Sequence, residues 1–290
     1  MNLFKWRHFQ YDIIIWAIRW YCKYGISYRD LEEMMGERGV EVDHSTIYRW
    51  VQKYSPILQK RLQWYWKPSP GLSWQVDETY IKVKGQWKYL YRAIDKQGKT
   101  VDFYLSSTRN GKAAKRFLCK ALRRLKAWEM PETINTDKAG CYEAAIKAMK
   151  KEGRCPETLV HRQVKYLNNR IEADHGKLKR LIKPTLGFKS MKSAYATIQG
   201  FELMHMFKKG QLSVWQYGQG FVGEVRLITH ALVRYSVFRN AAAKIRSANV
   251  FCNRTHKIVI FWTGYNHNIF SSIALGKPSR HNHRTLFNRK

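Results

Sequence analysis

The chain has 290 residues and a large excess of basic side chains, with 53 Lys plus Arg against 21 Asp plus Glu and a formal net charge of +32. This charge favours a polyanionic partner such as nucleic acid. With 44% hydrophobic and 14% aromatic residues the chain can build substantial cores, which excludes a globally disordered protein. The five cysteines are scattered and form no CxxC pair, which argues against a disulfide framework or a structural zinc site.

The sequence near the N-terminus has the pattern of neither a membrane span nor a secretory signal. The longest apolar run there, Ile13 to Ile18, is far shorter than the roughly 20 residues that cross a bilayer. A charged segment, an apolar segment and a small-residue cleavage site do not occur in order. We therefore expect a cytoplasmic protein.

The first part of the chain has the periodicity of three helices. Apolar residues recur at helical spacing over 9–24, over 27–39 and over 44–54, and Ser27 and Asp43 are suitable N-caps for the second and third segments. The order helix, helix, turn, helix is that of a helix-turn-helix, whose last helix enters the major groove. Any three-helix bundle would show the same period, but the net charge favours DNA reading. The expected DNA-contacting residues are His44, Ser45, Thr46, Arg49 and Lys53.

A linker with two prolines and a glycine follows at 65–71, and we place a domain boundary there, with one domain at 1–66 and a second at 67–231. Beyond it, strands are predicted over 73–83, 87–94 and 100–106, then a helix over 111–128 and a strand over 132–136. Further helices are predicted over 141–153, 168–182 and 190–209. This order, βββαβαα, predicts a mixed α/β domain.

Three carboxylates stand where they can meet. Asp77 lies inside the first strand, Asp137 directly follows the fourth, and Glu172 is on a helix. An acid within a central strand is costly unless something charged binds it. Three such carboxylates form an all-oxygen cage suited to two Mg²⁺ or Mn²⁺ ions for phosphoryl transfer.

The alternatives for these acids are ordinary structural roles. Asp137 could cap a turn, and Glu172 could be a solvated helix residue. Against this, Glu172, His175 and Lys179 share one helical face and would point toward the same crevice. Strand alternation points Glu78 away from Asp77. We interpret the competing acids as structural, namely Glu78, Asp95, Asp102 and Asp174.

Several blocks of the chain resemble the bacterial DDE transposases of insertion-sequence family six, the cointegrate-forming group. The resemblance covers about residues 2 to 231. The blocks that carry it are FKWRHF at 4–9, WYCKYGISYRDL at 20–31, VDHSTIYRWV at 42–51, DETY at 77–80, RAID at 92–95, NTDKA at 135–139, DHGKLKR at 174–180 and GFKSMK at 187–192. The family generally has a proline where this chain has Gly140, which alters the loop behind Asp137 and leaves the three acids in place.

The resemblance implies an RNase H-like catalytic domain with Asp77, Asp137 and Glu172 as the catalytic triad and Lys179 as its basic companion. It implies a nucleoid-associated enzyme that binds terminal inverted repeats, cleaves one strand at each end and transfers the freed 3′-OH to target DNA. Lys177 and Arg180 would hold phosphates. Bringing two ends together implies a homodimer or a larger assembly.

Two other readings explain part of the sequence. A DNA-binding regulator would use the predicted helix-turn-helix and leave the three carboxylates idle. An RNase H-like nuclease or resolvase would use the carboxylates without strand transfer. Of these three functions, only a transposase joins the terminal repeats to a new target, so an assay for joined products distinguishes them.

The segment 232–290 differs from the rest because it holds eleven Lys and Arg and no Asp or Glu. Family members usually end near Ala231. Terminal repeats of these elements resemble TTTTGCAACAGAACC, whose codons read Phe-Cys-Asn-Arg-Thr, the peptide at 251–255. Our hypothesis is that the reading frame has lost its stop codon and continues through the end of the element. The alternative is a selected basic extension that binds DNA.

Overall fold

The computed structural model describes residues 4, 8–63, 65, 73–137, 140–164, 168–213 and 219–234. Most of the predicted linker at 65–71, and the basic segment beyond 234 with its 251–255 peptide, lie outside these ranges. The helices within them do not combine the length and the apolar character that crossing a bilayer requires.

The three predicted N-terminal helices are present as α1 (Tyr11–Lys23), α2 (Tyr28–Gly36) and α3 (His44–Leu62). Ser27 and Asp30 close a capping box at the start of α2, and the Asp43 carboxylate accepts the Ser45 backbone N–H at the start of α3. The third helix runs eight residues further than predicted, through Pro56. Leu58 and Leu62 continue its apolar period and are buried, so packing outweighs the hydrogen bond that the proline removes.

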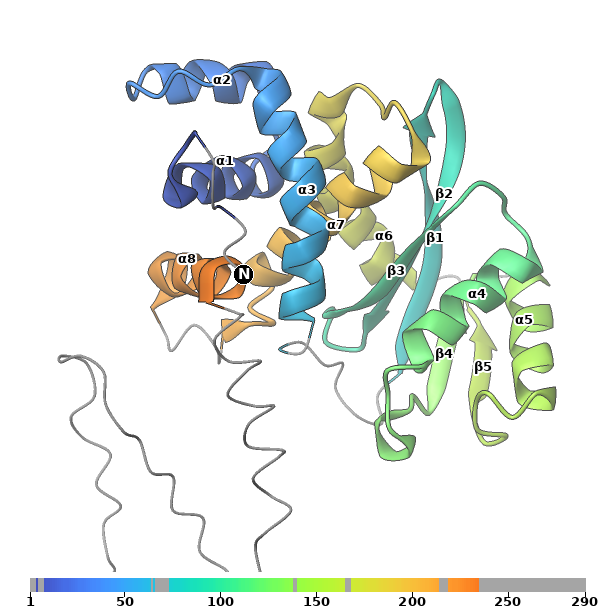
Figure 1. The fold of residues 1–290 in the computed structure, drawn as a ribbon. Helices are drawn as coiled ribbons and strands as arrows, with labels where there is room; N and C mark the ends of the chain where they lie inside the picture. Colours follow the sequence, from blue (N-terminus) through green and yellow to red (C-terminus); the bar gives the residue numbers. More distant parts are fainter. Residues whose placement is uncertain are drawn as a thin grey trace, which may run out of the picture. The chain divides into compact units, whose positions relative to one another are not determined.

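A five-stranded mixed sheet forms the second half (Figure 1). Its strands are β1 (Trp74–Val83), β2 (Gln86–Asp95), β3 (Thr100–Ser106), β4 (Thr133–Thr136) and β5 (Val160–Gln163), in the order β3-β2-β1-β4-β5. β1, β2 and β3 form an antiparallel meander, whereas β4 and β5 run parallel to β1. This confirms the predicted RNase H-like α/β domain.

β5 is the strand that the sequence did not predict. Its residues Val-His-Arg-Gln alternate between exposed and half-buried, so it lacks the apolar alternation that marks a strand. It is held instead by backbone pairing with β4, from Thr133 with Val160 to Thr136 with Gln163. The sheet edge therefore depends on tertiary context.

Helices cover both faces of the sheet (Figure 1). α4 (Gly111–Leu122) and α5 (Gly140–Lys151) share a core with Trp74 and Val76 of β1. α6 (Asn169–Ile182) and α7 (Met191–Lys208) belong to a second core with Ile81 and Val83. The helix predicted over 111–128 ends at Leu122, and a short 3₁₀ turn (Ala127–Glu129) follows. The alternation along β1 thus sends odd and even residues to different helical layers.

The second core also includes the N-terminal helices, since α7 packs against α1 and α3. The approach is close at Gly200, where an added Cβ would lie 2.5 Å from the Cys22 Sγ and 2.7 Å from the Ser55 Oγ. Only glycine fits this contact without displacement. Residues on both sides of the predicted 66/67 boundary therefore share one core, and the boundary itself stays a prediction.

The described chain ends in α8 (Gly220–Thr229) and a π-helical turn (His230–Arg234). Leu232 is 1% exposed, and the Arg61 Nη1 donates to the carbonyls of Ala231 and Leu232 at 2.7 and 3.1 Å. A truncation designed to test the origin of the basic segment should therefore keep residues up to 234.

Candidate active site

Strand pairing brings two of the predicted acids together. β1 and β4 are parallel with Trp74 beside Ile134 and Gln75 beside Asn135, so the same register continued by two residues places Asp137 level with Asp77. Neighbouring parallel strands lie about 4.8 Å apart and direct residues at the same level to the same face. One carboxylate oxygen from each of Asp77, Glu78 and Asp137 lies within 4.8 Å of the others.

Glu78 joins this cluster from the opposite face of β1. Its Oε2 accepts a hydrogen bond from the Tyr142 hydroxyl of α5 at 2.5 Å, and its Oε1 forms an ion pair with the Arg109 Nε. Burial raises the pKa of Glu78, although Tyr142 and Arg109 oppose the shift. Alternation was predicted correctly, yet the carboxylates approach because β4 ends at Thr136 and leaves the edge of β1 open.

Arg109 is the cation that touches this cluster from the end of the β3–α4 connection. Besides Glu78, its Nη2 lies 3.6 Å from the Asp137 Oδ2. Its side chain is 38% exposed, so it balances the acids only in part. Arg109 cannot be singled out from the sequence, because a single arginine before a helix carries no motif.

Asp77 faces α6, where it meets His175. The His175 Nε2 lies 3.3 Å from the Asp77 Oδ2, and both side chains are largely buried. The other ring nitrogen, Nδ1, lies 3.2 Å from the Nη1 of Arg92. Because arginine can only donate, Nδ1 accepts and the ring proton is on Nε2, facing Asp77. Burial lowers the pKa of His175, and the charge of Arg92 lowers it further. Together they outweigh the opposing effect of Asp77 and keep the ring neutral.

Arg92 is the centre of a buried ion-pair network. Its Nε and Nη2 donate to the two carboxylate oxygens of Glu202 at 2.5 and 3.0 Å, and Nη2 also donates to the Asp174 Oδ2 at 2.8 Å. Asp174 further pairs with His205 at 2.9 Å and with Lys209 at 2.8 Å. Burial disfavours its charge, but the His205 hydrogen bond and the Arg92 and Lys209 charges outweigh this and hold the pKa of Asp174 well below its ordinary range. All its negative charge is therefore matched by protein groups.

The remaining competing acids also have protein partners. Asp95 accepts the backbone N–H groups of Gln97 and Lys99 in the β2–β3 turn, and Asp102 pairs with Lys120 at 2.5 Å. Both acids therefore have the structural roles that the sequence suggested.

Glu172 is exposed and lies outside the carboxylate cluster. It precedes His175 by three residues on α6, about 4.5 Å along the helix axis, so it is on the turn next to the one that contacts Asp77. Lys179 is exposed on the same helix, as are Lys177 and Arg180. α6 packs on β1, and its buried Leu178 shares a core with Ile81 and Val83 of that strand, which holds this helix beside the cluster.

The carboxylate cluster fits a divalent cation. Three oxygens converge within 4.8 Å, and Mg²⁺ and Mn²⁺ take oxygen ligands. Asp77 and Asp137 are the accessible members, with side chains 16% and 35% exposed, whereas Glu78 is 2% exposed and committed to Tyr142 and Arg109. Asp77 and Asp137 could therefore hold an ion, and Glu172 lies on α6, the helix whose His175 contacts Asp77.

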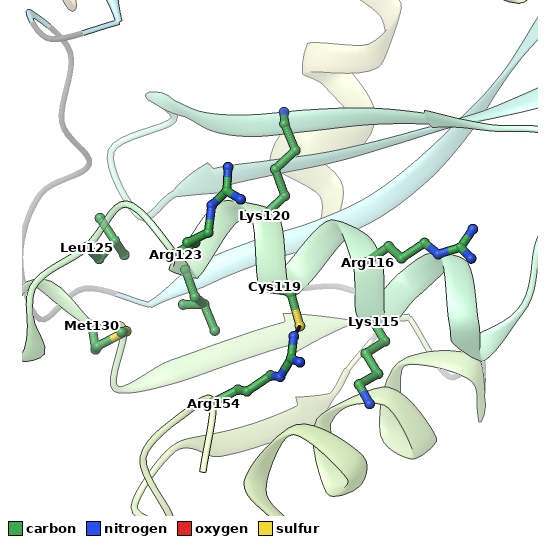
Figure 2. A pocket seen from close by; sticks show the side chains of 9 residues that line it. Lys115, Arg116, Cys119, Lys120, Arg123, Leu125, Met130 and Arg154 are labelled. Carbon is green, nitrogen blue, oxygen red and sulfur yellow. Dashed lines mark hydrogen bonds between the residues drawn. The ribbon is translucent and has the colours of Figure 1, made fainter. Parts of the chain in front are cut away.

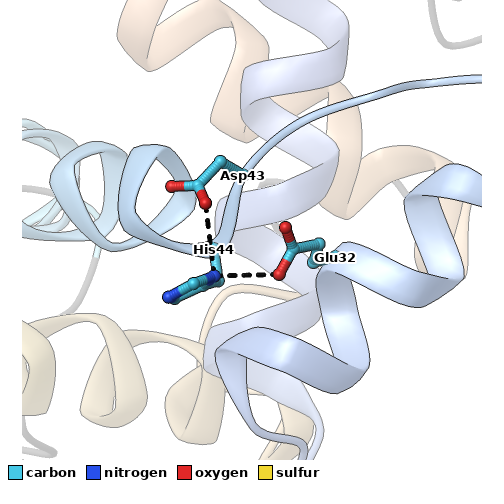
Figure 3. A group of neighbouring side chains, drawn as sticks. All are labelled: Glu32, Asp43 and His44. Carbon is cyan, nitrogen blue, oxygen red and sulfur yellow. Dashed lines mark hydrogen bonds and ion pairs between the residues drawn. The ribbon is translucent and has the colours of Figure 1, made fainter.

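The predicted DNA-contacting residues occupy the first three turns of α3. Figure 3 shows that His44 turns toward α2, where its Nδ1 lies 2.9 Å from the Glu32 Oε2 and 3.3 Å from the Asp43 Oδ2. Ser45 also pairs with Asp43. Thr46 is half-buried, whereas Arg49 and Lys53 are exposed along one side of the helix. Arg49 and Lys53 are thus better placed for a ligand than His44, which helps to join the two helices.

A separate cavity of about 590 Å³ lies on the outer face of α4 and is lined mainly by basic side chains (Figure 2). The carboxylates do not line it, so it is distinct from the site described above.

Comparisons with known proteins agree with this architecture. Residues 71–211 match the family described as a DDE domain. Over 228 residues the chain is 40% identical to the transposase for the insertion sequence-like element IS431mec of Staphylococcus aureus, covering 75% of this chain and 94% of that protein. Identity and coverage are the same for the transposase for insertion sequence element IS257 in transposon Tn4003 of Staphylococcus aureus.

The chain therefore belongs to the insertion-sequence transposases with a DDE catalytic domain, and the resemblance found in the sequence is confirmed. Among solved structures, the catalytic core domain of HTLV-2 integrase in complex with magnesium is similar, with a TM-score of 0.36 and 17% identity over 46% of this chain and 84% of that chain.

Proposed function

We propose that this transposase binds the terminal inverted repeats of its element through α1–α3, cleaves one strand at each end and transfers the 3′-OH ends to target DNA. The observation that carries the catalytic part is the meeting of Asp77 and Asp137 at the end of β4. Carboxylates held this close repel one another, which costs stability and supports a site that binds cations.

In this proposal Asp77, Asp137 and Glu172 hold two Mg²⁺ or Mn²⁺ ions. Bound cations of this kind lower the pKa of water and neutralise charge on a reacting phosphate. The His175 Nε2 lies 3.3 Å from the Asp77 Oδ2, and its Nδ1 lies 3.2 Å from the Arg92 Nη1, so His175 can help to orient this carboxylate. Glu172 supplies an exposed carboxylate from the next turn of α6.

The basic residues of α6 hold the DNA. Lys179 lies two helical turns beyond Glu172, and Lys177 and Arg180 are its exposed neighbours. Lysine ammonium and arginine guanidinium groups bind phosphate oxygens through charge-assisted hydrogen bonds. This arrangement lets α6 present carboxylate and phosphate-binding groups from one rigid element.

The reaction is tested with supercoiled plasmid that carries the terminal repeats, incubated with the full chain and Mg²⁺. We expect products in which repeat ends are joined to new target sites. Cleavage without joining would indicate a nuclease, and binding without cleavage would indicate a regulator. Asp137→Asn should lose both products while it still binds the repeat.

Repeat recognition is tested at Arg49. Arg49→Ala should weaken binding to the terminal repeat by roughly 1–3 kcal/mol more than binding to random duplex if the side chain reads a base edge. Lys60→Ala, exposed near the opposite end of α3, is the matched control and should leave this ratio unchanged. An equal loss of binding on both DNAs would assign Arg49 to a phosphate contact.

Because synapsis brings two ends together, we also propose that the active form is a homodimer or larger.

A further inference from the structure

Apart from Gly111 and Cys119, the residues on the solvent face of α4 are all basic. The helix buries Ala113, Ala114, Phe117, Leu118 and Ala121 against the sheet and contains no Asp or Glu. On the side of the helix that faces solvent, Arg116 and Arg123 are exposed, and Lys115 and Lys120 are half-exposed. Neither the proposed catalytic chemistry nor the predicted helix-turn-helix accounts for this face.

The basic side chains surround a cavity with a partly apolar lining (Figure 2). Leu122, Leu125 and Met130 are its apolar lining residues, and Arg154, which follows α5, lies below Cys119 in Figure 2. The cavity measures about 590 Å³, which exceeds the size of a single small anion. A ligand with several negative groups fits it better.

Local acids neutralise only part of this charge. Lys115 and Arg154 share Glu152, and Lys120 pairs with Asp102. Within the part of the chain that the structure describes, neither Arg116 nor Arg123 has an ion-pair partner. Uncompensated cations are left that attract an external polyanion.

The two unpaired cations continue a line of positive charge that starts at the carboxylate cluster. Arg109, which is paired with Glu78 and Asp137, lies two residues before the start of α4. Arg116 is seven residues further on, and Arg123 seven more, a spacing of about 10 Å for each two turns of helix. A ladder of positive charge at this spacing suits an extended chain of phosphates.

We propose that the outer face of α4, defined by Lys115, Arg116, Lys120, Arg123 and Arg154, binds the phosphate backbone of duplex DNA that passes the carboxylate cluster. The inference rests on the proposed function, since it extends the DNA path away from the reacting phosphate. A second copy of this chain is a poor occupant, because the same positive face would meet a protein of net charge +32.

The test compares two charge-matched double variants of the full chain. Arg116→Gln with Arg123→Gln removes the two unpaired cations of the α4 face, and Lys147→Gln with Lys151→Gln removes two exposed cations from α5. Binding to a duplex without the terminal repeat is measured from 50 to 200 mM salt. The α4 variant should reduce the slope of log K against log salt by about 1 to 2. The α5 variant should reduce it by less than about 0.5.

Equal slopes for the two variants would overturn the proposal. Both should still bind the terminal repeat in preference to random duplex, because α1–α3 are unchanged. Joining of repeat ends by the unmodified chain tests the proposed function separately, so a failure of that function and a failure of the α4 face give different results.

Cys119 supplies an independent readout because its thiol lines the same cavity, 3.6 Å from the Arg154 Nη1. Duplex DNA bound along the α4 face should slow alkylation of Cys119 at least about fivefold, measured by mass spectrometry at low salt and reversed at high salt. Alkylation at an unchanged rate under saturating duplex would also overturn the proposal.

Discussion

Two acidic regions meet at α6, and they differ in what balances their charge. Asp174 is buried and matched by Arg92, His205 and Lys209, all from the protein. Glu172, two residues earlier on the same helix, is exposed beside the cluster of Asp77 and its neighbours. In the first region the charge of Asp174 is matched by three protein groups, whereas in the second one partly exposed cation, Arg109, contacts a cluster of three carboxylates.

The contrast shows how to distinguish a structural acid from a ligand-binding acid. A buried acid whose hydrogen bonds are already made has little capacity for a further cation, and breaking such a pair exposes an uncompensated charge. Like charges held within 4.8 Å, as in Asp77, Glu78 and Asp137, are costly without a cation. The sequence analysis predicts Glu172 as the third acid and a structural role for Asp174, and in the structure Asp174 is paired with Arg92, His205 and Lys209.

The largest expected effect is on chemistry. Glu172→Gln should abolish cleavage and strand joining on the repeat-bearing plasmid while the unfolding free energy changes by no more than about 0.5 kcal/mol, because the side chain is exposed. Retained strand joining in this variant would show that Glu172 is not part of the metal site.

The next largest effect is on stability. Asp174→Ala should lower the unfolding free energy by about 3–5 kcal/mol, because Arg92 and Lys209 lose a buried partner. Urea denaturation measures this loss. A shift below about 1 kcal/mol would mean that the Arg92 region is not held together by its ion pairs.

Removing one carboxylate of the cluster should raise the unfolding free energy of the metal-free protein, in contrast to the loss expected for Asp174→Ala. Asp137→Asn relieves repulsion within the cluster, so the metal-free variant should be at least as stable as the unmodified chain. It should lose the stabilisation that Mn²⁺ gives the unmodified chain, about 2.7 kcal/mol at a concentration one hundred times the dissociation constant. Thermal denaturation with and without Mn²⁺ measures both. Mn²⁺ stabilisation equal to that of the unmodified chain would remove Asp137 from the metal site.

A smaller effect is expected where the two regions touch. His175 links Asp77 to Arg92, so His175→Ala should weaken Mn²⁺ binding by about 10- to 100-fold, as loss of a group that orients a metal ligand does. Titration of the full chain with Mn²⁺ measures it. His175→Asn, whose amide oxygen can take the Nδ1 position and accept from Arg92, is the matched comparison. Unchanged affinity in both variants would assign His175 a packing role only.

The smallest effect concerns an exposed acid with a backbone partner. The Ser27 backbone and side chain lower the pKa of Asp30. A lowered folded-state pKa stabilises the fold above the unfolded value of 3.8 and loses this contribution as pH falls below it. Asp30→Asn should therefore match the unmodified chain more closely at pH 3 than at pH 6 in thermal denaturation. A constant difference between them would exclude this linkage.

Local signals in the sequence determined most of the elements. Helical and strand periodicity located α1, α2, the three-stranded meander and β4 to within a few residues, and it located where α3 and α4 begin, because burial of one face imposes a short-range pattern. The same reasoning identified Asp77 and Asp137, since an acid within or directly after a buried strand is conspicuous. The blocks shared with insertion-sequence transposases identified the family.

Tertiary structure alone decided which charges meet. Arg92 lies in the apolar run Tyr-Arg-Ala-Ile, yet nothing local shows that Glu202 and Asp174 come from two different helices to neutralise it. β5 has no apolar alternation and exists because β4 offers it a paired edge. Glu78 reaches the cluster because β4 is short. Burial patterns repeat within a few residues and can be read along the chain, whereas charge pairing joins residues far apart and appears only once the chain has folded.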